Sequence, residues 1–216
     1  MKTHRLLIVD DHPIVRHGIA QLLGREPDIE CGLEAADAEA ALELLRGNAV
    51  DLVICDISMP GISGIDMVRR LASSKPGLPV LVITMHEEAI YAERALAAGA
   101  RGFITKHEAP DRLIAAVRRI LGGGVYMSPA LEQRMLDKAF GRTPPKEDAP
   151  PALQGLSERE FEVLQMLAQG LTSAEMGSRI NRSVKSVEAY RASLRTRLGA
   201  RSAADLTRLA VEFFKT

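Results

Sequence analysis

The stretch DLVICDISMPGISG, residues 51–64, carries the clearest indication of the fold. Its first part is a short apolar run that ends at Asp56, and its second part contains the proline and glycines typical of a turn. A continuous apolar strand without polar alternation belongs to a parallel sheet that is buried on both faces. The stretch therefore predicts a buried parallel strand that delivers Asp56 to a loop at its carboxyl end.

The same alternation of strand and helix runs through residues 1–121. The expected strands are rich in valine, isoleucine and leucine at residues 6–9, 51–55 and 78–84, with weaker candidates at 29–33 and 102–105. Helical patterns separate or follow them, at residues 13–23, 38–46, 65–72, 87–98 and 110–121. Five strand–helix units in succession predict an α/β fold, a (βα)5 doubly wound parallel sheet.

The chain has 216 residues, which is enough for one large domain or two small ones. Residues 141–152 hold four of the 11 prolines, a composition that suits an extended linker, and residues 129–140 could form a helix before it. We therefore expect an α/β domain at residues 1–121, a connecting segment at residues 122–152 and a small all-α domain at residues 153–216.

The pattern of residues 153–216 is helical throughout. A capping box from Ser157 to Glu160 precedes an apolar helix. Two further helices, expected at about residues 172–181 and 183–198, are joined by a tight polar turn, and a last helix follows them. Two short helices joined in this way, the second rich in arginine, are typical of a helix-turn-helix that binds the major groove of DNA.

The charge is balanced overall but not locally. The chain has 28 basic and 28 acidic residues, which taken as a whole argues against a nucleic-acid partner. Residues 153–216, however, hold ten basic and seven acidic residues, and residues 176–201 hold seven basic residues and one acid, Glu188. A local basic stripe matters more to DNA phosphates than the overall sum, so DNA remains the expected partner of the C-terminal domain.

Composition also predicts the cellular setting. No apolar run approaches the ~20 residues needed to span a bilayer, and the run at residues 6–9 is too short for a signal peptide. We expect a cytoplasmic protein without a membrane partner. Cys31 and Cys55 stand in apolar surroundings and are expected to be buried, reduced thiols, and the five histidines lack metal-site spacing.

Polar residues end four of the expected strands. Asp10 and Asp11 follow the first strand, Asp56 the third, Thr84 the fourth and Lys106 the fifth. The carboxyl ends of parallel strands share one edge of the sheet, so we expect these side chains to converge. Three carboxylates together require a cation, and oxygen ligands favour Mg²⁺. Beside a lysine, such a site suits phosphoryl transfer, in which a carboxylate attacks phosphorus to form an acyl phosphate.

These residues, together with the stretch at residues 56–64, resemble the receiver domain of bacterial response regulators. The resemblance covers about residues 1–121. It implies that Asp56 is the phosphoacceptor and that a partner histidine kinase supplies the phosphoryl group. It also implies that Thr84 and Lys106 bind phosphoryl oxygens.

The resemblance further implies a metal site and a switch. Mg²⁺ would be held by Asp11, Asp56 and the backbone carbonyl of Ser58, with Asp10 acting largely through water. Phe103 matches the aromatic switch position of the family, and the alternative for it is a plain core aromatic on the fifth strand.

The C-terminal domain resembles the LuxR-type helix-turn-helix at residues 156–172, 186–188 and 198–200. With a receiver in front, the whole chain is similar to the NarL/FixJ family of response regulators. The helix at residues 183–198 is the candidate reader of the major groove. Its candidate DNA contacts are basic residues, a serine suited to a phosphate and two positions that in the family often face bases: Lys185, Arg191, Arg195, Ser186, Glu188 and Ala189.

We interpret the chain as a phosphorylation-controlled transcriptional regulator rather than an enzyme. It would bind paired DNA half-sites as a homodimer, and RNA polymerase is a further candidate partner. An aspartate-based phosphatase would also use clustered acids and Mg²⁺, but it requires a second acid where Ser58 stands. A third interpretation is an interaction module that has lost DNA binding, because Tyr190 and Met176-Gly177 depart from the family pattern and Ser202-Ala203 lacks an arginine often found there.

Overall fold

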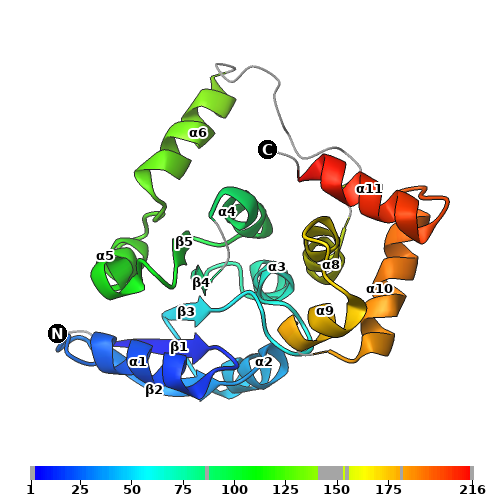
Figure 1. Ribbon diagram of the computed structural model, residues 1–216. Coiled ribbons are helices and arrows are strands. Elements are labelled where there is room, and N and C mark those ends of the chain that lie inside the picture. The colour runs from blue at the N-terminus through cyan, green and yellow to red at the C-terminus, as the bar shows by residue number, and fades with distance from the viewer. Residues whose placement is uncertain (1–2, 86–87, 141–152, 154–155, 181, 215–216) are drawn as a thin grey trace. The chain divides into compact units, whose positions relative to one another are not determined.

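The computed structural model divides into two compact units, Met1–Arg142 and Thr143–Thr216 (Figure 1). It describes residues 3–85, 88–140, 153, 156–180 and 182–214. Residues 141–152, for which the sequence predicts an extended linker, lie outside the described residues.

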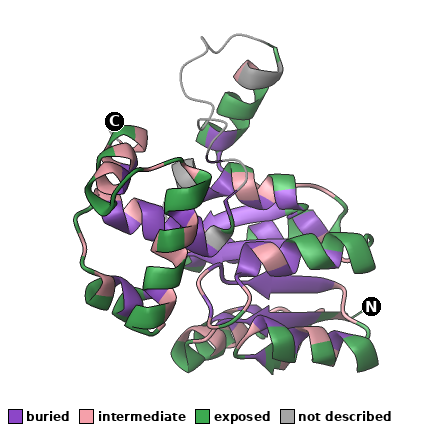
Figure 2. Ribbon diagram, turned by 90° about the vertical axis from the view of Figure 1, so that its right-hand side faces the viewer, coloured by how far each residue is buried: buried purple, intermediate pink, exposed green. Residues whose placement is uncertain are grey.

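The first unit is built on a five-stranded parallel sheet, which confirms the predicted α/β fold. The strand order is β2-β1-β3-β4-β5, with a crossover that places β1 between β2 and β3. The inner strands β3 and β4 are buried along their whole length, as the continuous apolar runs predict (Figure 2). The strands are β1 His4–Val9, β2 Ile29–Ala35, β3 Leu52–Cys55, β4 Val80–Thr84 and β5 Gly102–Thr105.

Helices cover both faces of this sheet. Helices α1 and α5 pack on one face, where their apolar residues join those of the strands in one core, and α2, α3 and α4 lie on the other (Figure 1). All five correspond to predicted helices. Their bounds are α1 Pro13–Leu23, α2 Ala38–Gly47, α3 Gly64–Ser74, α4 Glu88–Ala98 and α5 Ala109–Leu121.

The strand predicted at residues 78–84 begins later than expected, at Val80. The amide of Leu78 donates a hydrogen bond to the carbonyl of Lys75 at 2.9 Å and so closes the preceding turn. Pro79 has no amide hydrogen to donate to a neighbouring strand. The apolar run is therefore longer than the strand that it contains.

The chain stays attached to the sheet beyond α5. Tyr126 forms a parallel bridge with Gly102: its carbonyl accepts the amide of Phe103 at 3.1 Å, and its amide donates to the carbonyl of Arg101 at 2.9 Å. The guanidinium of Arg119 donates to the carbonyl of Val125 at 2.6 Å. The predicted helix at residues 129–140 follows as α6, Pro129–Ala139.

The second unit is helical, as predicted. Ser157 and Glu160 form the predicted capping box of α8, and a second capping box from Thr172 to Glu175 begins α9. Helices α9 and α10 pack against each other and form the helix-turn-helix (Figure 1). The helices are α8 Glu158–Ala168, α9 Ser173–Arg179, α10 Val184–Arg197 and α11 Ala203–Phe213.

The turn of this motif explains one departure from the family pattern. The carbonyl of Gly177 accepts the amide of Arg182 at 2.8 Å, and a Cβ at Gly177 would lie 2.6 Å from the carbonyl oxygen of Arg182. Glycine thus lets the turn approach α9 closely, which offsets its poor helix propensity. In the described part of both units, no helix is long and apolar enough to cross a membrane.

Candidate functional site

Asp56 lies at the carboxyl end of β3. Its amide donates to the carbonyl of Val9 at 2.9 Å, which fixes the residue to the neighbouring strand β1. One carboxylate oxygen, Oδ1, accepts the amide of Ile57 at 2.8 Å. The residue is only 3% exposed, so its carboxylate is held in place and largely removed from water.

The loop after Asp56 folds back on the strand. The amide of Gly64 donates to the carbonyl of Ile57 at 2.8 Å, and a Cβ at Gly64 would lie 1.9 Å from the carbonyl oxygen of Asp56. No other residue type fits there without a shift of the backbone. Ser63 then caps α3 by accepting the amide of Asp66. The glycine and the cap together set the path of the loop.

Lys106 connects three strand ends. Its Nζ lies 2.9 Å from Oδ2 of Asp56 and 2.6 Å from Oδ2 of Asp10, and its amide donates to the carbonyl of Thr84 at 2.7 Å. The structure thus brings together the strand-end residues that the topology argument places at one edge. The described peptide bonds include no cis bond, so the bond from Lys106 to His107 is trans.

His12 joins the acidic group, which sequence reasoning missed. Oδ1 of Asp10 accepts the amide of His12 at 2.8 Å, and the ring Nδ1 of His12 lies 2.7 Å from Oδ1 of Asp11. The side chain of His12 is 63% exposed, in keeping with a surface histidine, but its ring faces the acids. The signal that could have predicted this contact is the position of His12 directly after Asp10 and Asp11.

Burial dominates the electrostatics of the site. Removal from water raises the pKa of Asp56 to about 6, although the positive charge of Lys106 acts in the opposite direction and Asp10 adds to the rise. Burial also disfavours the charged form of Lys106, but the charge of Asp56 and hydrogen bonds to Asp10 and Asp56 outweigh it, so the pKa of Lys106 lies above its ordinary value.

The donor set fits a hard divalent cation. Ligand atoms of Asp10, Asp11, His12 and Asp56 lie within 4.8 Å of one another. In the described part of the chain, Oδ1 of Asp11 is buried without a hydrogen-bond partner, the ring of His12 being its one close ionic neighbour. Carboxylate oxygens are the donors that Mg²⁺ prefers, and the crowding of three aspartates is relieved by a bound cation.

The remaining predicted residues of this site differ in burial. Thr84 and Phe103 are fully buried, Thr84 as the last residue of β4 and Phe103 within β5, and Ser58 is half-buried in the loop after Asp56. Asp11 is also half-buried. The edge therefore presents the acids and Lys106, whereas Phe103 is part of the interior.

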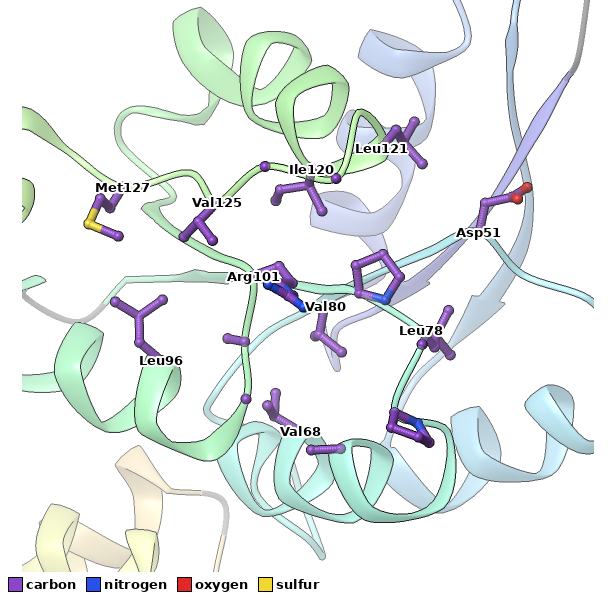
Figure 3. A pocket seen from close by; sticks show the side chains of 18 of the residues that line it. Asp51, Val68, Leu78, Val80, Leu96, Arg101, Ile120, Leu121, Val125 and Met127 are labelled. Atoms are coloured by element: carbon purple, nitrogen blue, oxygen red, sulfur yellow. The ribbon is translucent and has the colours of Figure 1, made fainter.

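A separate pocket of about 710 Å³ lies at the opposite end of the strands (Figure 3). Its lining includes Asp51, Leu78 and Arg101, which stand just before β3, β4 and β5, and Met127 beyond α5. Neither the aspartate cluster nor Lys106 is among its lining residues. The pocket is therefore distinct from the site at the carboxyl edge.

The predicted DNA-contact residues lie on α10. Lys185, Glu188, Ala189 and Arg195 are exposed, and Ser186 is half-buried. The amide of Ser186 donates to the side chain of the N-cap Ser183 at 3.1 Å, and the two hydroxyls are 2.9 Å apart.

Two of the predicted contacts, Arg191 and Glu188, are bonded to each other and to Ser173 of α9. The guanidinium of Arg191 donates to Oγ of Ser173 at 2.5 Å and to Oε1 of Glu188 at 3.2 Å. The hydroxyl of Ser173 donates to the same oxygen of Glu188. Sequence reasoning missed Ser173, because nothing in the spacing of α10 points to a partner on α9.

Comparison with known proteins agrees with this geometry. Residues 6–118 match the response regulator receiver domain, and residues 154–210 match the bacterial regulatory proteins of the luxR family. The receiver model alone covers more than half of the chain. These matches define a class of protein in which a receiver is joined to a LuxR-type DNA-binding domain.

Similar full-length proteins narrow the class. The transcriptional regulatory protein UhpA of Escherichia coli strain K12 is 39% identical over 201 residues, covering 93% of this chain and 94% of that protein. The transcriptional activator protein ExaE of Pseudomonas putida is 38% identical over 207 residues, covering 96% and 95%. The chain belongs to the NarL/FixJ family of two-component response regulators, which are transcriptional regulators and not enzymes.

Solved structures show the same two-domain construction. RcsB from Salmonella enterica serovar Typhimurium, bound to promoter rprA in the presence of phosphomimetic BeF3-, is 26% identical with a TM-score of 0.60, covering 97% of this chain and 99% of that chain. A structure of two RcsB dimers bound to two parallel DNAs is 25% identical with a TM-score of 0.58, covering 99% and 100%.

Proposed function

We propose that Asp56 accepts a phosphoryl group from a histidine kinase with Mg²⁺, and that this controls dimerisation and sequence-specific DNA binding. The observation that carries the proposal is the buried carboxylate of Asp56, held 2.9 Å from the Nζ of Lys106 beside the aspartate pair. A nucleophile, a cation and metal ligands at one strand edge are the parts that phosphoryl transfer requires.

The chain's own residues position the reaction. A carboxylate oxygen of Asp56 attacks phosphorus, the new P–O bond forms as the P–N bond to the kinase imidazole breaks, and the imidazole nitrogen leaves with the electron pair. The ammonium of Lys106 and the hydroxyl of Thr84 bind oxygens of the transferred group. Burial of Asp56 keeps competing water away from the acyl phosphate.

Asp11, Asp56 and the carbonyl of Ser58 would hold Mg²⁺, with Asp10 acting largely through water. When bound, the ion neutralises charge on the phosphoryl oxygens. Among these residues, the buried Oδ1 of Asp11 is the atom most in need of a cation, because the His12 ring is its one close ionic neighbour in the described part of the chain.

Phosphorylation at this edge would act on the interior through Thr84 and Phe103. Both residues are fully buried, so a shift at one of them requires its neighbours to move. We propose that this change favours a dimer whose DNA-binding domains occupy paired half-sites. One RcsB structure holds a phosphomimetic and a promoter, and another holds dimers on DNA, which supports this for a relative of the same construction.

Labelling with a small phosphodonor tests the site. With Mg²⁺ present, the protein should gain one phosphoryl group that hydroxylamine or alkali removes, as expected of an acyl phosphate. Asp56→Asn should abolish this gain, and Asp137→Asn on α6 should leave it unchanged. Label that persists in the Asp56→Asn protein would assign the phosphoacceptor to another residue.

Metal dependence is tested separately. Asp11→Ala deletes a direct ligand, so both Mg²⁺ affinity and phosphoryl uptake should fall. An unchanged Mg²⁺ dependence in this variant would remove Asp11 from the site.

The alternative of an interaction module that has lost DNA binding is tested by titrating random duplex DNA at several salt concentrations. A DNA-binding domain gives an affinity that falls steeply with salt, because phosphate contacts release counterions. No shift at low salt would favour the interaction module.

A further inference from the structure

Glu188 is an acid in a basic setting. It is the one acid among seven basic residues in the segment 176–201, and its side chain is 56% exposed on α10. A carboxylate on a helix that approaches DNA is repelled by phosphates unless its charge is compensated. Its position therefore calls for a function in which an acceptor is needed.

Two neighbours hold this carboxylate in one orientation. Oε1 of Glu188 accepts the hydroxyl of Ser173 and the guanidinium of Arg191, the latter at 3.2 Å. Arg191 also donates to Oγ of Ser173 at 2.5 Å, so the three side chains form a closed ring. Ser173 is the first residue of α9, and the ring thus ties both helices of the helix-turn-helix together.

The guanidinium in the ring compensates the negative charge of Glu188, and one carboxylate oxygen stays available to accept a hydrogen bond. Within the described part of the chain, Oε2 of Glu188 makes no hydrogen bond. Ala192, which is exposed and small, lies one turn after Glu188 on the same face of α10 and allows a close approach.

A carboxylate that is fixed in orientation, compensated in charge and has a free acceptor oxygen can bind the amino group of cytosine. In the major groove, the N4 amino group of cytosine is a donor that Glu accepts. We propose that Glu188 reads the cytosine of a C·G pair, and that Ser173 and Arg191 act on the DNA through Glu188 as positioning residues. This rests on the proposed function, in which α10 enters the major groove.

Selection from randomised duplexes with the phosphorylated full-length protein tests the reading. The selected half-sites should share one cytosine, and replacing that C·G pair by T·A should weaken binding between about 5- and 150-fold. Glu188→Gln should lose this discrimination or shift it to adenine, because a Gln amide pairs with adenine. Glu212→Gln, which removes an exposed, arginine-paired carboxylate on α11, should retain it.

Substitutions of Ser173 and Arg191 test their positioning role while Glu188, which would contact the base, stays unchanged. Ser173→Ala should reduce the preference for C·G over T·A severalfold while leaving the salt dependence of binding unchanged, because no charge is removed. In the Glu188→Gln background, Ser173→Ala should cause no further loss of discrimination. Arg191→Ala should likewise reduce the preference only when Glu188 is present.

The outcomes separate the two proposals. Sequence-specific binding with an unchanged cytosine preference in Glu188→Gln would overturn this inference and leave the proposed function intact. Independent, additive losses from Ser173→Ala and Glu188→Gln would overturn the positioning role. Absence of salt-dependent DNA binding in the wild-type protein would overturn both proposals.

Discussion

The position of Asp56 depends on Gly64, because their backbones touch. In Gly64→Ala, the new Cβ would meet the carbonyl oxygen of Asp56 at 1.9 Å, so the loop must move. We expect the free energy of unfolding of the receiver to fall by about 1–3 kcal/mol, the usual range for overpacking, and phosphoryl uptake to slow. Denaturant unfolding of the full chain, followed through the receiver transition, measures the change.

Gly18 provides the matched control for this substitution. It lies inside α1 with nothing within 4 Å of a built Cβ. Gly18→Ala should therefore raise the free energy of unfolding by roughly 0.5–1 kcal/mol. Similar destabilisation in both variants would show that close contact with Asp56 is not the cause.

The raised pKa of Asp56 predicts a pH-dependent stability. The folded-state pKa of about 6 exceeds the value near 3.9 expected in the unfolded chain. Between these values the folded protein binds more protons, so the stability of the metal-free protein falls as pH rises from about 4 to 6 and stays low above that. Asp56→Asn should therefore raise the melting temperature at neutral pH without Mg²⁺.

Melting temperatures measured across pH, with and without Mg²⁺, check this expectation. The advantage of Asp56→Asn should vanish toward about pH 4, where the wild-type carboxyl is protonated in the folded state and begins to be protonated in the unfolded chain. Saturating Mg²⁺ should also reduce it by stabilising the wild-type protein. A variant that melts below the wild-type protein at neutral pH without metal would contradict the assignment of burial as the dominant cause.

At the residue scale, the sequence predicts the contacts that strand topology alone requires. Asp10, Asp56 and Lys106 are predicted to meet because strand ends share an edge, and the structure brings them together. The contact of Ser173 with Glu188 could not be predicted, since it depends on how two helices cross and not on spacing within either. The ring of His12 turned toward Asp11 is likewise a rotamer choice that no periodicity encodes.

At the element scale, Glu160 links the start of α8 to α10. Its carboxylate accepts the amide and hydroxyl of Ser157, both at 2.8 Å, the hydroxyl of Ser193 at 2.5 Å and the Nε of Arg197 at 3.2 Å. Burial alone would raise the pKa of Glu160, but these hydrogen bonds and the charge of Arg197 outweigh it and lower the pKa.

Glu160→Gln should therefore destabilise the DNA-binding domain near neutral pH by about 1 kcal/mol, because the amide can still cap α8 but loses the charge that strengthens the contacts to Ser193 and Arg197. Because the folded pKa is lowered, the stabilisation is present above the unfolded value near 4.3 and is lost as pH falls through the folded pKa. Urea unfolding at neutral and acidic pH measures the difference, which should shrink at the lower pH.

Glu175→Gln on α9 provides the control for this cap. Glu175 accepts the amide and hydroxyl of Thr172, as Glu160 does with Ser157, but within the described residues it has no hydrogen bond to α10. Glu175→Gln should therefore lower the free energy of unfolding of the domain by less than Glu160→Gln does. Equal effects of the two substitutions would mean that the contacts of Glu160 to Ser193 and Arg197 add nothing.

Element prediction succeeds where patterns are long and fails where pairing is local. The strands and helices of the α/β unit are all predicted, because buried apolar runs and capped helices carry strong signals. The bridge from Tyr126 to Gly102 is missed, because a single paired residue after three glycines has no periodicity. The strand β2 extends to Ala35, beyond its predicted end, and the carbonyl of Ala35 accepts the amide of Asp10.

At the scale of the whole molecule, phosphorylation should act mainly through pairing of two copies. A single helix-turn-helix offers a small interface, so binding to two half-sites about one helical turn apart benefits from dimers. The phosphodonor should raise affinity for a two-half-site duplex far more than for one half-site. DNA titrations on both duplexes, with sedimentation of the free protein, measure the two effects.

Lys185→Ala tests whether the DNA contact and the switch are independent. Lys185 is exposed on α10, so its removal should weaken binding to both duplexes while leaving phosphorylation and the sedimented mass unchanged. Equal enhancement of the two duplexes by the phosphodonor, without a change in mass, would rule out dimerisation as the switch.

Tyr126 also protects an open edge of the sheet. Strand β5 is an edge strand. Tyr126 accepts the amide of Phe103 and donates to the carbonyl of Arg101, two edge groups that would otherwise stand unpaired. Unpaired edge groups are templates for edge-to-edge aggregation. A receiver fragment cut at residue 121 would lose this cover and tend to associate through β5, whereas one that retains Tyr126 keeps the edge closed and its Phe103 amide slow to exchange with solvent.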